Sequence, residues 1–108
     1  MKLLDQSFDL RFESLQYYEL ANDTVGYIYA LREIGYEYRL KNQYDSAMWY
    51  YNKAIDYSNI IQNYEVQNIV QLGIANVYSD QGLYDDVIYQ LRNNVIVNKY
   101  NSDAINIF

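Results

Sequence analysis

The sequence predicts an all-α fold, and three observations lead to that prediction. Apolar residues recur at steps of three and four, which is the spacing of one face of an α-helix. Residues that break helices are rare, because the 108 residues include no Pro and only four Gly. Two segments of the chain also match each other at a fixed offset, as in helical repeat proteins.

Four apolar stripes give the expected helices in order, with short polar segments between them. Asn42 and Gly82 each fall between the two stripes of a pair, and both residue types adopt the left-handed conformation that commonly ends a helix. Asp45, Asp85 and Asp86 follow at the expected helix starts, where a carboxylate interacts favourably with the helix dipole. The stripes cover residues 28–38, 44–55, 70–78 and 84–95.

The two pairs of stripes form an internal repeat. Residues 38–47 align with residues 78–87 at an offset of 40, so that Tyr38 corresponds to Tyr78 and Tyr44 to Tyr84. Internal repeats with a period of about 20 to 50 residues are typical of solenoid proteins. A plain antiparallel helical bundle remains the alternative, because it uses the same helices and differs only in how they pack.

The two copies of the internal repeat resemble the tetratricopeptide repeat, whose pattern is Trp-x2-Leu-Gly-x2-Tyr followed by Ala-x3-Phe. The resemblance implies that the small residues Gly35 and Ala75 let neighbouring helices approach closely. The matching positions, which we expect to pack between helices, are Leu31, Ile34, Gly35, Tyr38, Ala47, Tyr51 and Ala54 in the first copy, and Ile74, Ala75, Tyr78, Val87 and Leu91 in the second.

The chain departs from the family pattern in three respects. It lacks the terminal Pro, it has the polar Gln71 in the Trp position of the second copy, and its period is 40 residues. The usual period is about 34 residues. We therefore expect the second helix of the first pair to be extended by about one turn, through residues 56–63.

The resemblance implies antiparallel helix pairs stacked as a right-handed α-α superhelix. It divides the chain into a partial repeat at 1–25, a first repeat at 28–67, a second repeat at 68–101 and the start of a further helix at 102–108. Because the sequence stops just after that start, we interpret the chain as a fragment of a larger repeat protein.

The first helix of each pair is expected to line the concave face of such a superhelix. Arginine and tyrosine alternate along this line in the first copy and suit a peptide that carries a carboxylate or an aromatic side chain. An ordinary solvated face, supported by Glu33 and Glu37, is the alternative. The residues in question are Tyr29, Arg32, Tyr36 and Arg39.

The corresponding line in the second copy is Ile69, Leu72, Asn76 and Ser79. Exposed Ile and Leu would mark a contact patch, and the Asn76 amide can both donate to and accept from a peptide backbone. The alternative is that the longer preceding helix covers Ile69 and Leu72.

Composition argues against several other function classes. With no Cys and no His, the chain has no thiol nucleophile, no imidazole base and no Cys/His zinc site. The adjacent Asp85 and Asp86 point to different helix faces, and no Gly-rich phosphate loop is present. The net charge of -6 opposes attraction to nucleic acid or to an anionic membrane. We therefore expect no enzyme activity, no cofactor, no metal, and no nucleic-acid or membrane partner for this segment.

The first residues lack the apolar stretch of a secretory signal, and the longest charge-free run, 66–79, is too short for a membrane span. We expect a cytoplasmic chain as written, and a periplasmic one if an export signal precedes it.

Two classes of function remain. The first is a protein-interaction module or scaffold that binds a protein or peptide segment on its concave face. The second is a structural, self-associating or sensor segment of a larger bacterial transcriptional regulator, in which the end segments 8–18 and 95–108 stack on another copy.

Overall fold

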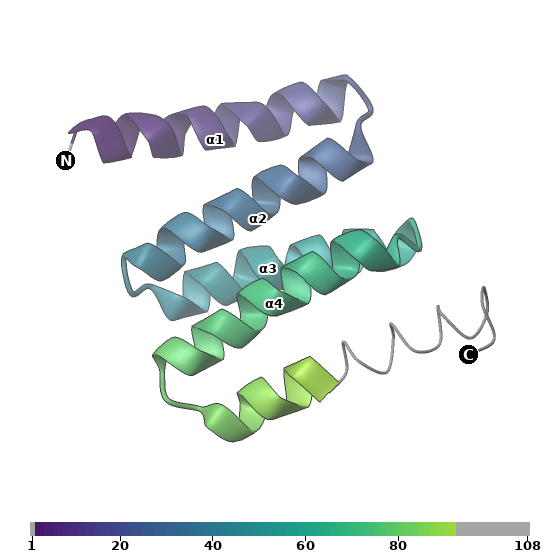
Figure 1. The fold of residues 1–108 in the computed structure, drawn as a ribbon. Helices are drawn as coiled ribbons and strands as arrows, with labels where there is room; N and C mark the ends of the chain where they lie inside the picture. The colour runs from purple at the N-terminus through teal and green to yellow at the C-terminus, as the bar shows by residue number, and fades with distance from the viewer. Residues whose placement is uncertain (1, 93–108) are drawn as a thin grey trace.

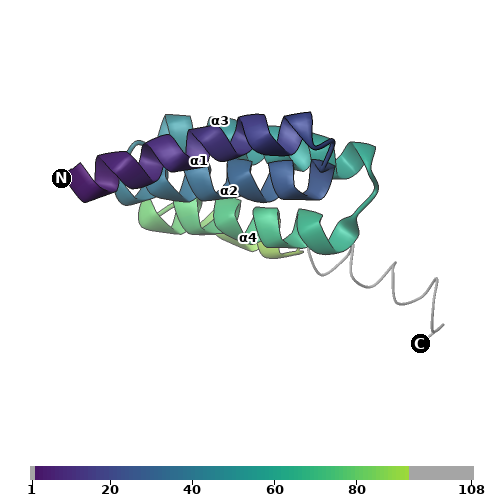
Figure 2. The same cartoon turned by 90° about the horizontal axis from the view of Figure 1, so that it is seen from above.

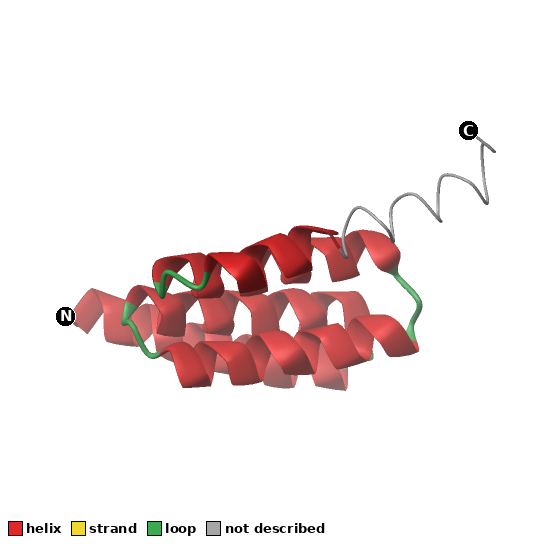
Figure 3. Cartoon of the chain, turned by 90° about the horizontal axis from the view of Figure 1, so that it is seen from below, coloured by secondary structure: helices red, strands yellow, loops and turns green. Residues whose placement is uncertain are grey.

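The computed structural model describes the backbone of residues 2–92 and the side chains of residues 9–92. Over these residues the chain is all-α, as the sequence predicts, and it contains no strand (Figure 3). Figure 1 shows the helices as a stack in chain order. They are α1 (Lys2–Leu20), α2 (Thr24–Leu40), α3 (Tyr44–Ile60) and α4 (Tyr64–Asp80), followed by a helical segment at 84–92.

The helices and turns follow a regular spacing. Helix starts at residues 24, 44, 64 and 84 are 20 residues apart, and three-residue turns separate the helices. The middle residue of each turn has a positive φ, and the amide that follows it donates a hydrogen bond to the carbonyl five residues earlier, which is the Schellman pattern of helix termination. These middle residues are Asn22, Asn42, Gln62 and Gly82, with φ values of 60°, 61°, 54° and 75°.

The turn at Gln62 corrects the expected helix extension. α3 ends at Ile60, so residues 61–63 form a turn and do not prolong the helix. The 40-residue period therefore comes from two equal helices and two equal turns, and not from one long helix. The expected first repeat, 28–67, consequently begins inside α2 and ends inside α4.

Side-chain capping alternates along the stack. The Asp23 carboxylate accepts a hydrogen bond from the Gly26 amide at 2.9 Å, and the Asn63 side chain accepts one from the Val66 amide at 3.1 Å. Gln43, in the same place before α3, makes no such bond. The first helix of each pair is thus capped, and a cap of this kind typically stabilises a helix by about 1 kcal/mol.

The helices pack as an open stack. Each labelled helix contacts the next one, and α2 also contacts α4, whereas the backbones of α1 and α4 do not approach each other. Figure 2 shows α1 and α3 toward one edge of the stack and α4 toward the opposite edge, with α2 between them. A closed four-helix bundle would bring its first and fourth helices together. This arrangement excludes that alternative for the described residues and is that of a helical repeat.

The core lies where α2, α3 and α4 meet, and most of the expected packing positions belong to it. Tyr38, Tyr78 and Val87 are half-buried. Leu91 departs from the expectation: it is 42% exposed because its helix is the outermost of the described stack (Figure 1). The buried positions are Leu31, Ile34, Gly35, Ala47, Tyr51, Ala54, Ile74 and Ala75.

Aromatic side chains join the first three helices. The Tyr38 and Tyr50 rings are stacked with centroids 5.5 Å apart, and Phe12 meets Tyr50 edge-on at 6.0 Å. Such pairs contribute about 1 kcal/mol beyond the area that they bury.

In the part of the chain that the structure describes, no helix is both long enough and apolar enough to cross a membrane.

Candidate binding groove

A groove of about 460 Å³ runs between α2 and α4, the first helices of the two pairs. Seven of the eight residues that the sequence singled out for a concave face line it, and the eighth, the exposed Ser79, does not. α2 contributes an aromatic and cationic wall, and α4 contributes an apolar and amide wall. The lining residues are Tyr29, Arg32, Tyr36 and Arg39 from α2, Ile69, Leu72, Gly73 and Asn76 from α4, and Tyr51 from α3.

Tyr51 forms the floor of the groove, a role that the sequence did not suggest because this residue fills a packing position of the repeat. Its ring is almost fully buried between the backbones of α2 and α4. A Cβ atom placed on Gly35 would lie 3.2 Å from the ring, and one placed on Gly73 would lie 2.6 Å from it. Glycine at both places therefore creates the slot through which a side chain of α3 reaches the groove.

The Tyr51 hydroxyl remains a neutral phenol at physiological pH. Burial raises its pKa, and the nearby Arg39 and Arg32 guanidinium groups offset only part of that effect. The floor of the groove thus presents a group that can both donate and accept a hydrogen bond.

Arg39 closes one end of the groove by pairing with Asp80. Its Nε donates to Oδ2 at 2.6 Å and its Nη2 donates to Oδ1 at 3.2 Å, so both carboxylate oxygens are engaged. The pair lowers the pKa of Asp80 and raises that of Arg39, in each case chiefly through these hydrogen bonds. Sequence reasoning missed Asp80, which lies 41 residues from Arg39.

Arg32 keeps its cation available to the groove. It is half-buried, and no carboxylate of the described residues lies within salt-bridge distance of it. Glu33 and Glu37, which the sequence suggested as support for this face, turn toward α1 instead. There they pair with Arg11, at 3.5 Å for Glu33 Oε2 and 3.1 Å for Glu37 Oε1.

The α4 wall is open to solvent in part. Leu72 is 48% exposed, so α3 does not cover it, while Ile69 is half-buried. Tyr36 on the facing wall is 42% exposed, and Asn76 is exposed. The groove therefore offers an apolar strip opposite a cation, with hydrogen-bonding groups on its floor and wall.

The arrangement has no geometry suited to a metal. Within residues 9–92, no group of three or more carboxylates comes together in a way that could hold an ion. The polar groups that face the groove are two guanidinium groups, phenols and an amide, which bind ligands through hydrogen bonds, stacking and charge.

Comparison of the chain with protein-family models, with curated proteins and with solved structures finds no match in any of the three. The groove between α2 and α4 is therefore the feature of the molecule that bears most directly on its function.

Proposed function

We propose that the chain is a non-catalytic protein-interaction module of the tetratricopeptide kind, which binds a peptide segment in the groove between α2 and α4. The single observation that carries the proposal is the position of Arg32. A half-buried guanidinium with no acidic partner among the described residues faces a groove whose opposite wall exposes Leu72. A cation beside an apolar strip is complementary to a peptide that has a carboxylate next to an apolar side chain.

Each wall has a defined role in this proposal. Arg32 forms a two-pronged hydrogen-bonded pair with the peptide carboxylate. Ile69 and Leu72 contact the apolar side chain, and Tyr36 adds ring area at a small entropic cost. Asn76 holds the peptide backbone by donating and accepting hydrogen bonds.

The proposal includes no chemical step. The groove residues comprise no carboxylate, thiol or imidazole that could act as a nucleophile or general base at neutral pH. Binding through these groups also requires no cofactor or metal.

The experiment is a selection from a displayed random-peptide library, followed by fluorescence-polarisation titration of the recovered peptide. Arg32→Ala should weaken binding at least tenfold while leaving the melting temperature unchanged, because Arg32 forms no ion pair with any residue that the structure describes. Lys53→Ala is the matched control, since Lys53 lies over Trp49 on α3 and does not line the groove. Equal weakening by both variants, or failure to recover any peptide, would count against the proposal.

Self-association is a second candidate, and the outer face of α1 favours it. Leu10, Tyr17 and Leu20 are 62%, 68% and 88% exposed on that helix. The other surface that the sequence suggested for stacking, at 95–108, lies outside the described residues, as does the helix expected at 102–108. Sedimentation velocity of wild type and Tyr17→Asp over a hundredfold concentration range tests this candidate. A strict monomer at every concentration would exclude it.

A further inference from the structure

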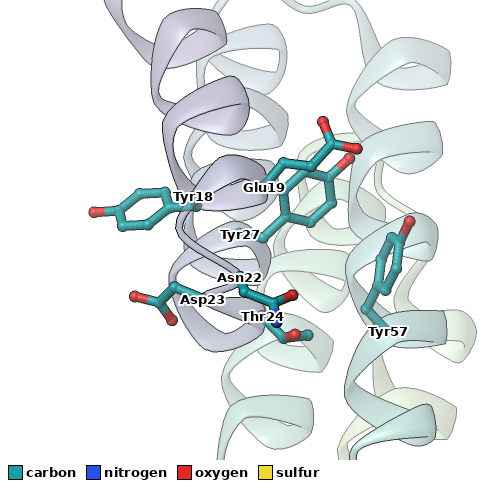
Figure 4. A pocket seen from close by; sticks show the side chains of 7 residues that line it. All are labelled: Tyr18, Glu19, Asn22, Asp23, Thr24, Tyr27 and Tyr57. Carbon is teal, nitrogen blue, oxygen red and sulfur yellow. The ribbon is translucent and has the colours of Figure 1, made fainter.

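A second cavity, separate from the groove, lies at the turn between α1 and α2. It has a volume of about 180 Å³, and Figure 4 shows the seven residues around it. Tyr27 and Tyr57 form its wall, and the Glu19 carboxylate lies beside the Tyr27 hydroxyl (Figure 4). Tyr18 and Asp23 point to the other side of the α1 end, so the groups that converge are Glu19, Asn22, Thr24, Tyr27 and Tyr57.

The two tyrosines are held in a fixed relation. Their ring centroids are 5.2 Å apart, and the rings meet edge-on at 78°. Burial, followed by the neighbouring Tyr57 and Glu19, raises the pKa of Tyr27. Tyr27 therefore stays a neutral phenol, and the ring faces and hydroxyl oxygens of the two tyrosines attract a cation.

Glu19 supplies a negative charge that the described chain does not neutralise. The ion pairs of the described residues use Arg11 and Arg39, and neither reaches Glu19. The start of α2 carries a partial positive charge from its helix dipole, but the capping Asp23 carboxylate offsets that charge at the same turn.

The junction between α3 and α4, one repeat period later in the chain, provides an internal comparison. Adding the 40-residue period to Glu19 and Tyr27 gives Asn59 and Gln67. At that junction the Gln67 amide donates a hydrogen bond to the Asn59 side-chain oxygen. At that junction two uncharged amides are linked by a hydrogen bond, whereas the equivalent junction between α1 and α2 has a carboxylate beside two phenols.

We propose that the cavity between α1, α2 and Tyr57 binds a primary ammonium group, supplied by a lysine side chain of a peptide or by a free diamine. The ammonium pairs with Glu19, donates to the tyrosine hydroxyls and lies against their rings, while its methylene chain occupies the remaining volume. A group of this size matches the small cavity, and the net charge of -6 attracts cationic partners.

The test is a titration of the full chain followed by ¹H–¹⁵N NMR, at constant ionic strength. The probes are N-acetyl-lysine N-methylamide, the isosteric but neutral N-acetyl-norleucine N-methylamide, and cadaverine. We expect saturable shifts of amides in and beside the 21–23 turn with the lysine derivative and none with the norleucine derivative. Saturation by cadaverine with equal affinity would identify a free diamine as a sufficient ligand, and its failure to saturate would identify a peptide lysine. Either result supports the ammonium site.

The variants distinguish this site from general charge attraction. Glu19→Gln should weaken the lysine derivative at least tenfold, and Tyr57→Phe should weaken it to a smaller extent. Glu13→Gln is the matched control, because Glu13 is also an exposed acid of α1 but does not line the cavity. Shifts that never saturate, binding of the norleucine derivative, or equal effects of Glu19→Gln and Glu13→Gln would overturn the proposal.

Discussion

Arg39 near the end of α2 and Asp80 at the end of α4 form a two-pronged ion pair, with Nε–Oδ2 at 2.6 Å and Nη2–Oδ1 at 3.2 Å. The two helices belong to successive repeats, so the pair ties one repeat to the next at the end of the groove. The pair is partly exposed: the Arg39 and Asp80 side chains keep 23% and 29% of their accessible surface, and Asp80 lies at the exposed end of its helix.

We expect Asp80→Asn to lower the free energy of unfolding by about 0.5–1 kcal/mol at pH 7, the range of a partly exposed ion pair. The folded state lowers the pKa of Asp80, so the stabilisation is complete above the ordinary Asp value of about 4 and is lost as the pH falls through the lowered value. Urea unfolding of wild type and variant between pH 2 and pH 7 measures this. The free energies of unfolding of wild type and variant should converge at the acidic end of this range. A difference that stays constant with pH would show that the Asp80 carboxylate is not the source of the stabilisation.

The slot around Tyr51 gives a prediction about the two glycines. Gly73→Ala would place a Cβ atom 2.6 Å from the Tyr51 ring, which is almost fully buried between two helices. We expect a loss of about 1–3 kcal/mol in spite of the higher helix propensity of alanine. In Gly35→Ala the contact is 3.2 Å, and the two effects should nearly cancel. Thermal unfolding of both variants tests whether Gly73→Ala is the less stable of the two. Equal stability would show that the Tyr51 ring is free to shift.

The ion pair between Arg11 and Glu37 should matter more for stability than its counterpart with Glu33. The Glu37 side chain is 6% exposed, and its Oε2 has no hydrogen-bond partner. Arg11→Met keeps the aliphatic packing but leaves this buried carboxylate without its cation, and we expect a loss of about 2 kcal/mol. Combining Arg11→Met with Glu37→Gln should restore part of the loss, which a double-mutant cycle by chemical denaturation measures. Additive losses would mean that the two side chains are not coupled.

The alternation of helix caps predicts an alternation of mutational effects. Asp23→Ala removes a bond to the Gly26 amide and should cost about 1 kcal/mol, whereas Gln43→Ala removes no such bond and should cost less than about 0.5 kcal/mol. Urea denaturation of the two variants tests the difference. Similar losses at both positions would contradict the capping role of Asp23.

Repetition in the sequence predicts the helical fold, but it does not predict the turn at residues 61–63. Asn42 and Gly82 are residue types that favour a positive φ, and both adopt it. Gln62 adopts the same conformation without that preference, because the packing of α3 and α4 fixes the turn between them. The helix was therefore expected to continue where it in fact ends.

The sequence by itself determined the all-α fold, the 40-residue period and the line of groove residues on each first helix, but not the end of α3. These properties depend on hydrogen bonding and side-chain spacing within a single helix, which local sequence records. Only the tertiary structure decided that the Tyr51 ring reaches the floor of the groove and that the Arg39 guanidinium pairs with Asp80. It also decided that the Arg32 guanidinium faces the groove without a carboxylate of the described residues beside it. Those outcomes depend on how far one helix is shifted and rotated against the next, and no local pattern encodes contacts between side chains about 40 residues apart.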